Sequence, residues 1–259
     1  MIRTEINTEF NLDNYRSVSL ERLERLNLLS RFDIKFAVHL SKLPQILSLF
    51  QHDYSILEID GRRNFCYNNQ YFDTKDYMFY NQHHNGKANR DKIRFRNYSD
   101  SSQCYFEIKH KSNNSKTSKI RIRINNQESS IFGEVGNLIV KELGIHPEDL
   151  IQTLNVSYKR ITLINEKKQE KITLDRNIEF HTSDEQYCMT DIALIEVKQK
   201  CINNDSESIQ SLKKLNVHKI SGFSKYCMGL VNTNKKIKYN RFKKQQLLIK
   251  KIMRQENGE

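Results

Sequence analysis

Residues 92–96 read Lys92-Ile93-Arg94-Phe95-Arg96, and residues 119–124 read Lys119-Ile120-Arg121-Ile122-Arg123-Ile124. In both stretches a basic residue alternates with an apolar one. Successive side chains of a β-strand point to opposite faces of its sheet, so this period of two predicts strands with one basic and one apolar face. The fold must bury the apolar face and still accommodate rows of positive charge on the other.

Three further stretches alternate in the same way. Tyr105-Phe106-Glu107-Ile108-Lys109 and Ile195-Glu196-Val197-Lys198 each place a glutamate and a lysine on one face, and residues 171–175 separate Ile172 and Leu174 from Lys171 and Asp175. On a single strand such charges are typical of a half-exposed antiparallel sheet. Over several strands the charged face is mainly Lys and Arg, and like charges on neighbouring strands repel.

A closed antiparallel β-barrel with a basic, water-filled lumen accounts for this pattern, with helices covering its apolar outer faces. We therefore expect an α+β fold. Apolar spacing and capping residues predict helices at residues 19–31, 43–50, 131–143 and 206–215. The expected end signals are Ser19 and Ser41 as N-caps, Pro44 in a first turn and Gly144 as a stop.

The composition and net charge limit the classes of partner that this protein is expected to bind. The chain has 259 residues, of which 43 are Lys or Arg and 31 are Asp or Glu, so its formal net charge is +12. We expect a folded, cytoplasmic protein, because aromatic residues make up 10% and neither a signal peptide nor a membrane-spanning apolar run is present. The charge predicts an anionic partner and, by itself, leaves nucleic acid, an acidic membrane surface and phosphate compounds open.

The cysteines and histidines give no metal or disulfide signal. Five widely spaced cysteines without a C-x-x-C pair argue against a disulfide framework and a thiolate zinc site. Cys104 and Cys227 have apolar neighbours and are expected in the core. The pair His83-His84 is expected in a loop or at the rim of a cleft.

A basic lumen containing a few carboxylates suits phosphate chemistry. Arg and Lys neutralise successive phosphate groups, and Glu107 and Glu196 are candidate ligands for Mg²⁺ or Mn²⁺, which bind through few carboxylates plus phosphate oxygens. Together these groups stabilise the charge that develops in phosphoryl transfer. The chain lacks the P-loop and the glycine loop of kinases, so any nucleotide triphosphate is held by a different architecture.

Eight short strings, taken together in their order and spacing, carry a resemblance to a known family. They are Arg31–Phe36, Tyr71–Thr74, Asn89–Arg96, Phe106–Lys109, Tyr158–Arg160, Ile172–Asp175, Ile195–Lys198 and Ser221–Tyr226. From about residue 31 to residue 242, ending in Asn240-Arg241-Phe242, the chain resembles the VTC (vacuolar transporter chaperone) polyphosphate polymerase domain. The resemblance implies an eight-stranded tunnel barrel of the triphosphate tunnel metalloenzymes, which are related to CYTH phosphatases.

The activity implied by the resemblance is polymerisation of polyphosphate from ATP with Mn²⁺ or Mg²⁺. By position, Glu196 matches a metal-binding glutamate and Lys225 a tunnel lysine near the transferred phosphate, so both are the catalytic candidates. Lys119 or Arg121 fills a further basic position, and register alone does not decide between them. The phosphate-binding candidates are Lys35, Arg94, Arg96, Lys109, Lys119, Arg121, Arg160 and Lys198.

One departure bears on the reaction. The Glu-x-Glu-x-Lys signature of many CYTH hydrolases reads Arg31-x-Asp33-x-Lys35 here, with one carboxylate fewer, which favours the polymerase branch. The alternatives are a tunnel triphosphatase acting on inorganic triphosphate or RNA 5′-triphosphate, and a non-catalytic module that binds polyanions or nucleic acid. Nucleic acid is not the expected partner.

The expected organisation is an N-terminal extension over residues 1–30, a tunnel domain over residues 31–242 and a basic C-terminal helix or tail over residues 243–259. One interpretation of this last segment is a solvated helix docked by Leu247, Leu248 and Ile252. The other is attraction to anionic lipid or to polyphosphate, which would make the protein membrane-peripheral.

Overall fold

A computed structural model describes residues 10, 12–26, 32–101, 103–112, 117–125, 130–201 and 203–254. Its central feature is one large sheet that joins twelve of the described strands. The main strands are β2 (Phe32–His39), β4 (Phe65–Thr74), β5 (Arg90–Tyr98), β6 (Gln103–Lys111), β7 (Thr117–Ile124), β8 (Leu150–Asn165), β9 (Glu170–His181), β11 (Ile192–Gln199) and β12 (His218–Lys219). Three shorter strands, β1 (Arg16–Val18), β3 (Ser55–Leu57) and β10 (Gln186–Met189), join its margins.

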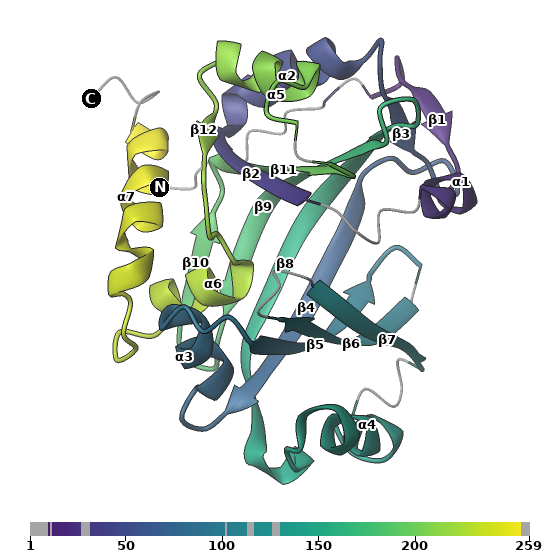
Figure 1. Ribbon diagram of the computed structural model, residues 1–259. Helices are drawn as coiled ribbons and strands as arrows, with labels where there is room; N and C mark the ends of the chain where they lie inside the picture. Colours follow the sequence, from purple (N-terminus) through teal and green to yellow (C-terminus); the bar gives the residue numbers. More distant parts are fainter. Residues whose placement is uncertain are drawn as a thin grey trace.

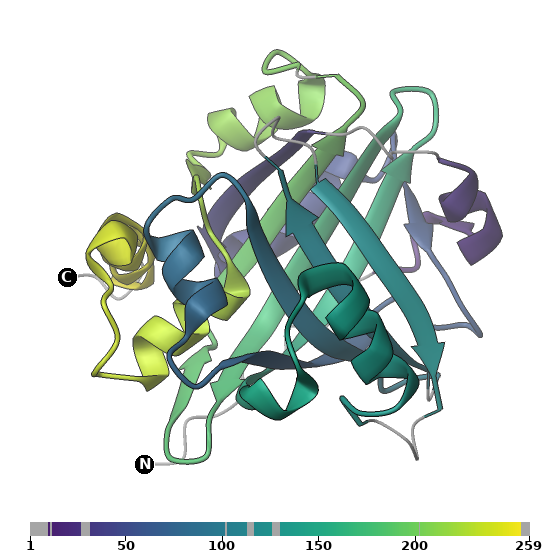
Figure 2. The ribbon, with the colours of Figure 1, turned by 60° about the horizontal axis from the view of Figure 1, so that its bottom comes forward.

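The sheet is strongly curved, and helices cover its outer face. In Figure 1, β2 and β11 lie above, β5, β6 and β7 lie below, and the long strands β8 and β4 connect the two walls. The upper wall packs Phe36, Ile172 and Val197 against α2 (Leu43–Phe50) and α5 (Glu207–Lys214). The lower wall packs Phe95 and Phe106 against α4 (Glu134–Leu143), which lies over β5–β7 in Figure 2. The expected α+β fold with apolar outer faces under helices is confirmed.

The expected closed, eight-stranded barrel is wrong in both respects, because the described sheet has twelve strands and is not closed. Hydrogen-bonded neighbours follow the open order β12-β2-β11-β9-β8-β4-β5-β6-β7, so among the described strands β12 and β7 form two unjoined edges. β12 has only two residues, after which the chain turns into α6 (Lys225–Thr233). Two lysines of the sheet contact the residues just before α6. Lys35 Nζ on β2 donates to the Phe223 carbonyl at 3.1 Å, and Lys92 Nζ on β5 donates to Ser224 Oγ at 2.8 Å.

The four predicted helices are present with adjusted ends. α1 (Leu20–Arg25) begins at the expected N-cap Ser19, and the rest of that prediction falls on residues 27–31, outside the described part. α2 has the predicted bounds, but its N-cap is Lys42 rather than Ser41, because residues 40–42 form a 3₁₀ turn. α4 begins at Glu134, later than expected, and ends at Gly144 in the left-handed region as predicted.

Two helices arise from long-range contacts that the sequence pattern did not reveal. α3 (Met78–His84) contains the two histidines expected in a loop, and His84 is buried. The Asp73 carboxylate stabilises its first turn by accepting hydrogen bonds from the backbone N–H groups of Phe79 and Tyr80 at 2.8 and 2.9 Å. α6 packs Met228 and Leu230 into the cluster that contains Leu154, Val156 and Phe180 of the sheet.

The C-terminal helix, α7 (Lys243–Arg254), packs onto the body of the protein. Ile249 and Ile252 are buried in the same cluster as α6, and Leu248 packs against it. Of the three expected docking residues, Leu247 is instead 57% exposed, because it lies on the opposite side of the helix from Ile249. No described helix is long and apolar enough to cross a membrane.

Candidate active site on the inner face of the sheet

The inner face of the curved sheet carries the predicted site residues. In β5 and β6 the apolar positions Ile93, Phe95, Phe106 and Ile108 belong to the outer cluster under α4, so the alternating positions point inward. The same rule applies to Lys35, Arg160, Glu196 and Lys198, whose neighbours along the strands lie in the outer cluster under α2 and α5. The strand register places both Lys119 and Arg121 on the inner face, opposite Lys109 and Glu107, so it does not separate these two candidates.

Glu107 is the centre of the cationic group on the lower wall. Its side chain is 2% exposed, and its carboxylate oxygens lie 2.6 Å from Arg94 Nη2, 3.7 Å from Arg96 Nε, 2.5 Å from Lys119 Nζ and 3.6 Å from Arg121 Nε. Burial alone would raise the pKa of this carboxyl, but the surrounding cations lower the pKa below its ordinary value. Glu107 therefore stays ionised and holds four phosphate-binding candidates together, and its role as a metal ligand stays a prediction.

Asp175 plays the corresponding part on the upper wall. Arg160 donates to it through Nε at 2.5 Å and Nη2 at 2.7 Å, and Lys225 Nζ donates to the same carboxylate. Although burial would raise its pKa, Arg160 and Lys225 lower the pKa of Asp175 well below the ordinary range. Alternation placed Asp175 on the charged face, yet its partner Lys225 is 50 residues away in the chain, so no local pattern could reveal the pair.

Glu196 lies between two predicted phosphate-binding lysines. It is opposite Lys35 in the register of β2 and β11, with 3.6 Å between Lys35 Nζ and Glu196 Oε1, and Lys198 Nζ contacts its other oxygen. Asp33 lies opposite Lys198, on the same face and diagonal to Glu196. Burial lowers the pKa of Lys35, against the opposing effect of Asp33. This corner thus combines two carboxylates with two cations.

The donor set of this corner fits a divalent cation that shares its ligands with phosphate. The Glu196 side chain is 21% exposed, so a ligand can reach it. Within the described residues, no group of three or more His, Cys, Asp or Glu side chains could hold a metal by itself. Mg²⁺ is commonly held by one or two carboxylates and completed by substrate phosphates, and the pair Asp33 and Glu196 meets that requirement.

Lys92 was not among the predicted site residues, although it occupies the first basic position of the strand that decided the fold. Its Nζ group donates to Ser224, whose Oγ also accepts a hydrogen bond from the backbone N–H of Cys227 as N-cap of α6. Burial, together with the charges of Lys109 and Lys35, lowers the pKa of Lys92 to about 8. The alternation of basic and apolar residues over positions 92–96 was the signal that could have placed Lys92 on the inner face.

Four tyrosines hold the arginines of the inner face in place. Tyr71 Oη accepts a hydrogen bond from Arg94 at 2.8 Å. The Arg160 guanidinium lies 5.0 Å from the ring centre of Tyr67 and 5.1 Å from that of Tyr158, and Arg121 donates to Tyr98 Oη at 3.0 Å. Cation–π and hydroxyl contacts restrict the guanidinium groups without neutralising them, so their charge stays available to a phosphate chain.

The start of α6, which carries Lys225, is fastened by a buried polar contact. Tyr226 Oη donates to the Asp73 carboxylate, the same group that caps α3. Both residues are at most 1% exposed. The next residue of α6, Cys227, is buried as expected, and its Sγ lies 3.0 Å from His83 Nδ1 on α3. The site therefore depends on α3 and α6 as well as on the sheet.

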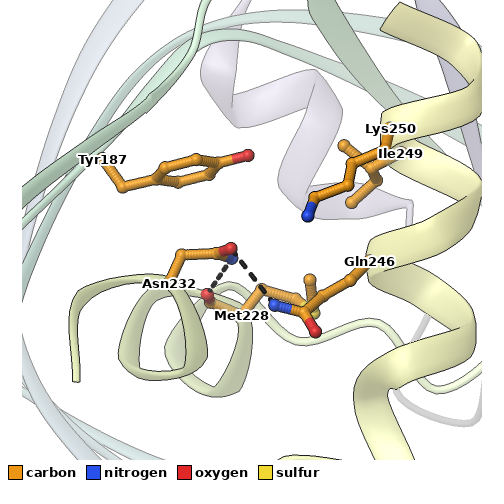
Figure 3. Close-up of a pocket in the computed structure, with 6 residues that line it drawn as sticks. All are labelled: Tyr187, Met228, Asn232, Gln246, Ile249 and Lys250. Atoms are coloured by element: carbon orange, nitrogen blue, oxygen red, sulfur yellow. Dashed lines mark hydrogen bonds between the residues drawn. The ribbon is translucent and has the colours of Figure 1, made fainter. Parts of the chain in front are cut away.

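A cavity between α6 and α7 lies among other residues and is not part of this site. Figure 3 shows its lining by Tyr187, Met228, Asn232, Gln246, Ile249 and Lys250. Its volume is about 10 Å³, enough for at most one water molecule. It offers no room for a phosphate group.

Similarity to known proteins extends over most of the chain. The model of the VTC domain family matches residues 30–234. The "putative adenylate cyclase" of Bacillus halodurans is 16% identical and similar in structure, with a TM-score of 0.52 over 74% of this chain and 92% of that chain. HpAC1 of Hippeastrum, for which a dominant triphosphatase activity is described, is 14% identical, with a TM-score of 0.49 over 78% of this chain and 97% of that chain. Curated proteins contain no matching sequence.

Proposed function

Because this chain belongs to the VTC domain family, we propose that it is an ATP-dependent polyphosphate polymerase. The coarser conclusion, a triphosphate-related activity, already follows from the family and its tunnel fold. In the proposed reaction the terminal phosphate of ATP passes to phosphate or to the end of a growing polyphosphate chain. Both the donor and the acceptor are polyanions, which suits an inner face lined by Lys and Arg on two walls.

One observation carries the choice of a polymerase over a hydrolase. Glu107 and Asp175, the two buried carboxylates of the inner face, are each occupied by cations that lower their pKa values. Neither is suited to take a proton from water, because a general base needs a pKa near the working pH. A phosphate acceptor is already an oxyanion and needs no deprotonation. The state of these two buried carboxylates therefore supports phosphate rather than water as the attacking group.

The proposed roles of the site residues differ with their positions in the fold. Arg94, Arg96, Lys119 and Arg121 would hold one stretch of phosphates on the lower wall, and Arg160 and Lys198 another on the upper wall. Lys225 extends from the N-terminus of α6 and would orient the transferred phosphate and stabilise its charge. Asp33 and Glu196 would hold Mn²⁺ or Mg²⁺. When bound, the metal supplies positive charge to the phosphate oxygens.

The proposal is tested by incubating the purified chain with γ-labelled ATP and Mn²⁺ and separating the products on a gel. We expect labelled chains of increasing length. The variant Lys225→Ala should make few or none, whereas Lys75→Ala, which removes an exposed lysine outside the inner face, should match the wild type.

Two results would contradict the proposal. Release of orthophosphate alone, from ATP or from inorganic triphosphate, would assign a tunnel triphosphatase instead. Formation of a cyclic nucleotide from ATP would assign a cyclase, because that reaction uses the ribose hydroxyl rather than phosphate as acceptor.

A further inference from the structure

A large part of the excess positive charge of this protein lies outside the inner face, near the C-terminal helix. Residues 235–254 contain nine Lys or Arg and no Asp or Glu. Without them the chain has 34 basic against 31 acidic residues, close to neutral. The inner face also keeps more cations than its four carboxylates Glu107, Asp175, Glu196 and Asp33 can balance, so the net charge of +12 has two sources, the site and the C-terminal surface.

On α7 this charge forms one face. At 3.6 residues per turn, Lys243, Leu247, Lys251 and Arg254 lie along one side of the helix, with Lys244 at its edge, within about a third of the circumference. All five are exposed, while Ile249 and Ile252 on the other side are buried. Figure 1 places α7 at the outer edge of the molecule. We call these five residues the basic face.

The basic face has no acidic partner among the residues that the structure describes. Within the described part of the chain, none of its four cations pairs with a carboxylate, and the preceding exposed residues Lys235, Lys236, Lys238 and Arg241 add to the same local charge. Unscreened like charges at neighbouring helix positions are unfavourable. An anionic surface outside the protein would remove this repulsion.

We propose that the basic face docks this protein on an anionic lipid bilayer. Leu247 lies among the cations of this face and is 57% exposed, so it can enter the headgroup region while the Lys and Arg side chains contact the lipid phosphates. Clustered Lys and Arg on one side of a helix are attracted to such membranes additively. A linear polyphosphate chain would gain nothing from Leu247, and the cavity beside α7 is too small to bind one. The proposal does not depend on the proposed polymerase activity.

The test is co-sedimentation of the full chain with vesicles of phosphatidylcholine alone and of phosphatidylcholine with 30% phosphatidylserine. We expect binding to the anionic vesicles only, and weaker binding as salt rises. The fourfold variant K243Q/K244Q/K251Q/R254Q should bind at least about tenfold more weakly. The matched control K75Q/K87Q/K141Q/K167Q removes as many exposed lysines elsewhere and should retain more of the affinity than the fourfold variant of the basic face. Leu247→Ala should weaken binding by a smaller factor.

Several outcomes would overturn the proposal. Equal binding to neutral and anionic vesicles, no binding to either, or equal losses in the two fourfold variants would each contradict it. Binding of long-chain polyphosphate is measured in parallel, without vesicles. If the variant of the basic face lost polyphosphate affinity as strongly as vesicle affinity, the occupant would be polyphosphate and the bilayer proposal would be wrong. A thermal melt of each variant confirms that it is folded, as expected for substitutions at exposed positions.

Discussion

Lys92 Nζ on β5 donates a 2.8 Å hydrogen bond to Ser224 Oγ, the N-cap of α6. These two residues are 132 positions apart in the chain, and their contact joins the strand that decided the fold to the helix that carries Lys225. The contact matters because the sheet is not closed by backbone pairing among the described strands. The position of α6 against the inner face depends on such side-chain contacts.

The first prediction concerns the pH dependence of phosphate binding. Since the pKa of Lys92 is lowered to about 8, the protein should lose one positive charge on the inner face as pH rises through 8. The affinity for tripolyphosphate should fall severalfold between pH 7 and pH 9 in a titration by calorimetry. The variant Lys92→Arg stays charged over this range and should show a smaller decline. An identical decline in the variant would assign the effect to another group.

The same shift predicts a change in stability. The folded protein binds fewer protons at Lys92 than the unfolded chain between pH 8 and about 10.5, so the free energy of unfolding gains a contribution that rises with pH in this window. Chemical denaturation at pH 7.5 and pH 9.5 should show this gain in the wild type and not in Lys92→Met. Other groups contribute equally to both proteins and cancel in the comparison.

The second prediction separates the two glutamates. Glu107→Gln removes a buried negative charge among four cations, so it should lower the free energy of unfolding by about 3 kcal/mol. It should leave Mn²⁺ affinity, measured by electron paramagnetic resonance in the presence of tripolyphosphate, within about twofold. Glu196→Gln should lower that affinity at least about tenfold. A large loss of Mn²⁺ binding in Glu107→Gln would instead support the predicted metal role of Glu107.

The third prediction concerns Lys225. Because its ammonium group is held beside Asp175 and over the ring of Tyr158, at 4.5 Å from the ring centre, Lys225→Ala should lower kcat by about a hundredfold or more. Its polyphosphate affinity should change only severalfold, since other cations of the inner face remain. Equal losses in turnover and in affinity would show that Lys225 binds the chain without acting in the transfer.

The fourth prediction concerns the contact between Asp73 and Tyr226. Tyr226→Phe removes the hydroxyl donor from a buried carboxylate and should cost about 2 kcal/mol of stability. Because α6 carries Lys225, kcat should also fall while KM for ATP stays nearly constant. Leu230→Ala, a truncation in the same helix, serves as the control: it should lower stability with a smaller effect on kcat. If Tyr226→Phe and Leu230→Ala lowered kcat equally, the contact between Asp73 and Tyr226 would have only a structural role.

Much of the candidate site followed from the period-two pattern. The pattern identified which residues of β5, β6, β7 and β11 share a face, because side-chain alternation is a local property of an extended chain. It also placed Lys171 and Asp175 on that face. It could not decide between Lys159 and Arg160, because adjacent basic residues satisfy either alternative. In the structure Arg160 reaches Asp175, whereas Lys159 is exposed.

The contacts that complete the site were beyond such reasoning. α3 and the start of α6 depend on Asp73, whose partner Tyr226 is 153 residues away. The open edges of the sheet likewise follow from where the short strand β12 stops. The sequence by itself determined the alternation of β5, β6, β7, β9 and β11, their basic inner face and the family. Only the tertiary structure decided which carboxylate neutralises which cations and that the sheet stays open, because these depend on contacts between residues far apart in the chain, about which a local repeat carries no information.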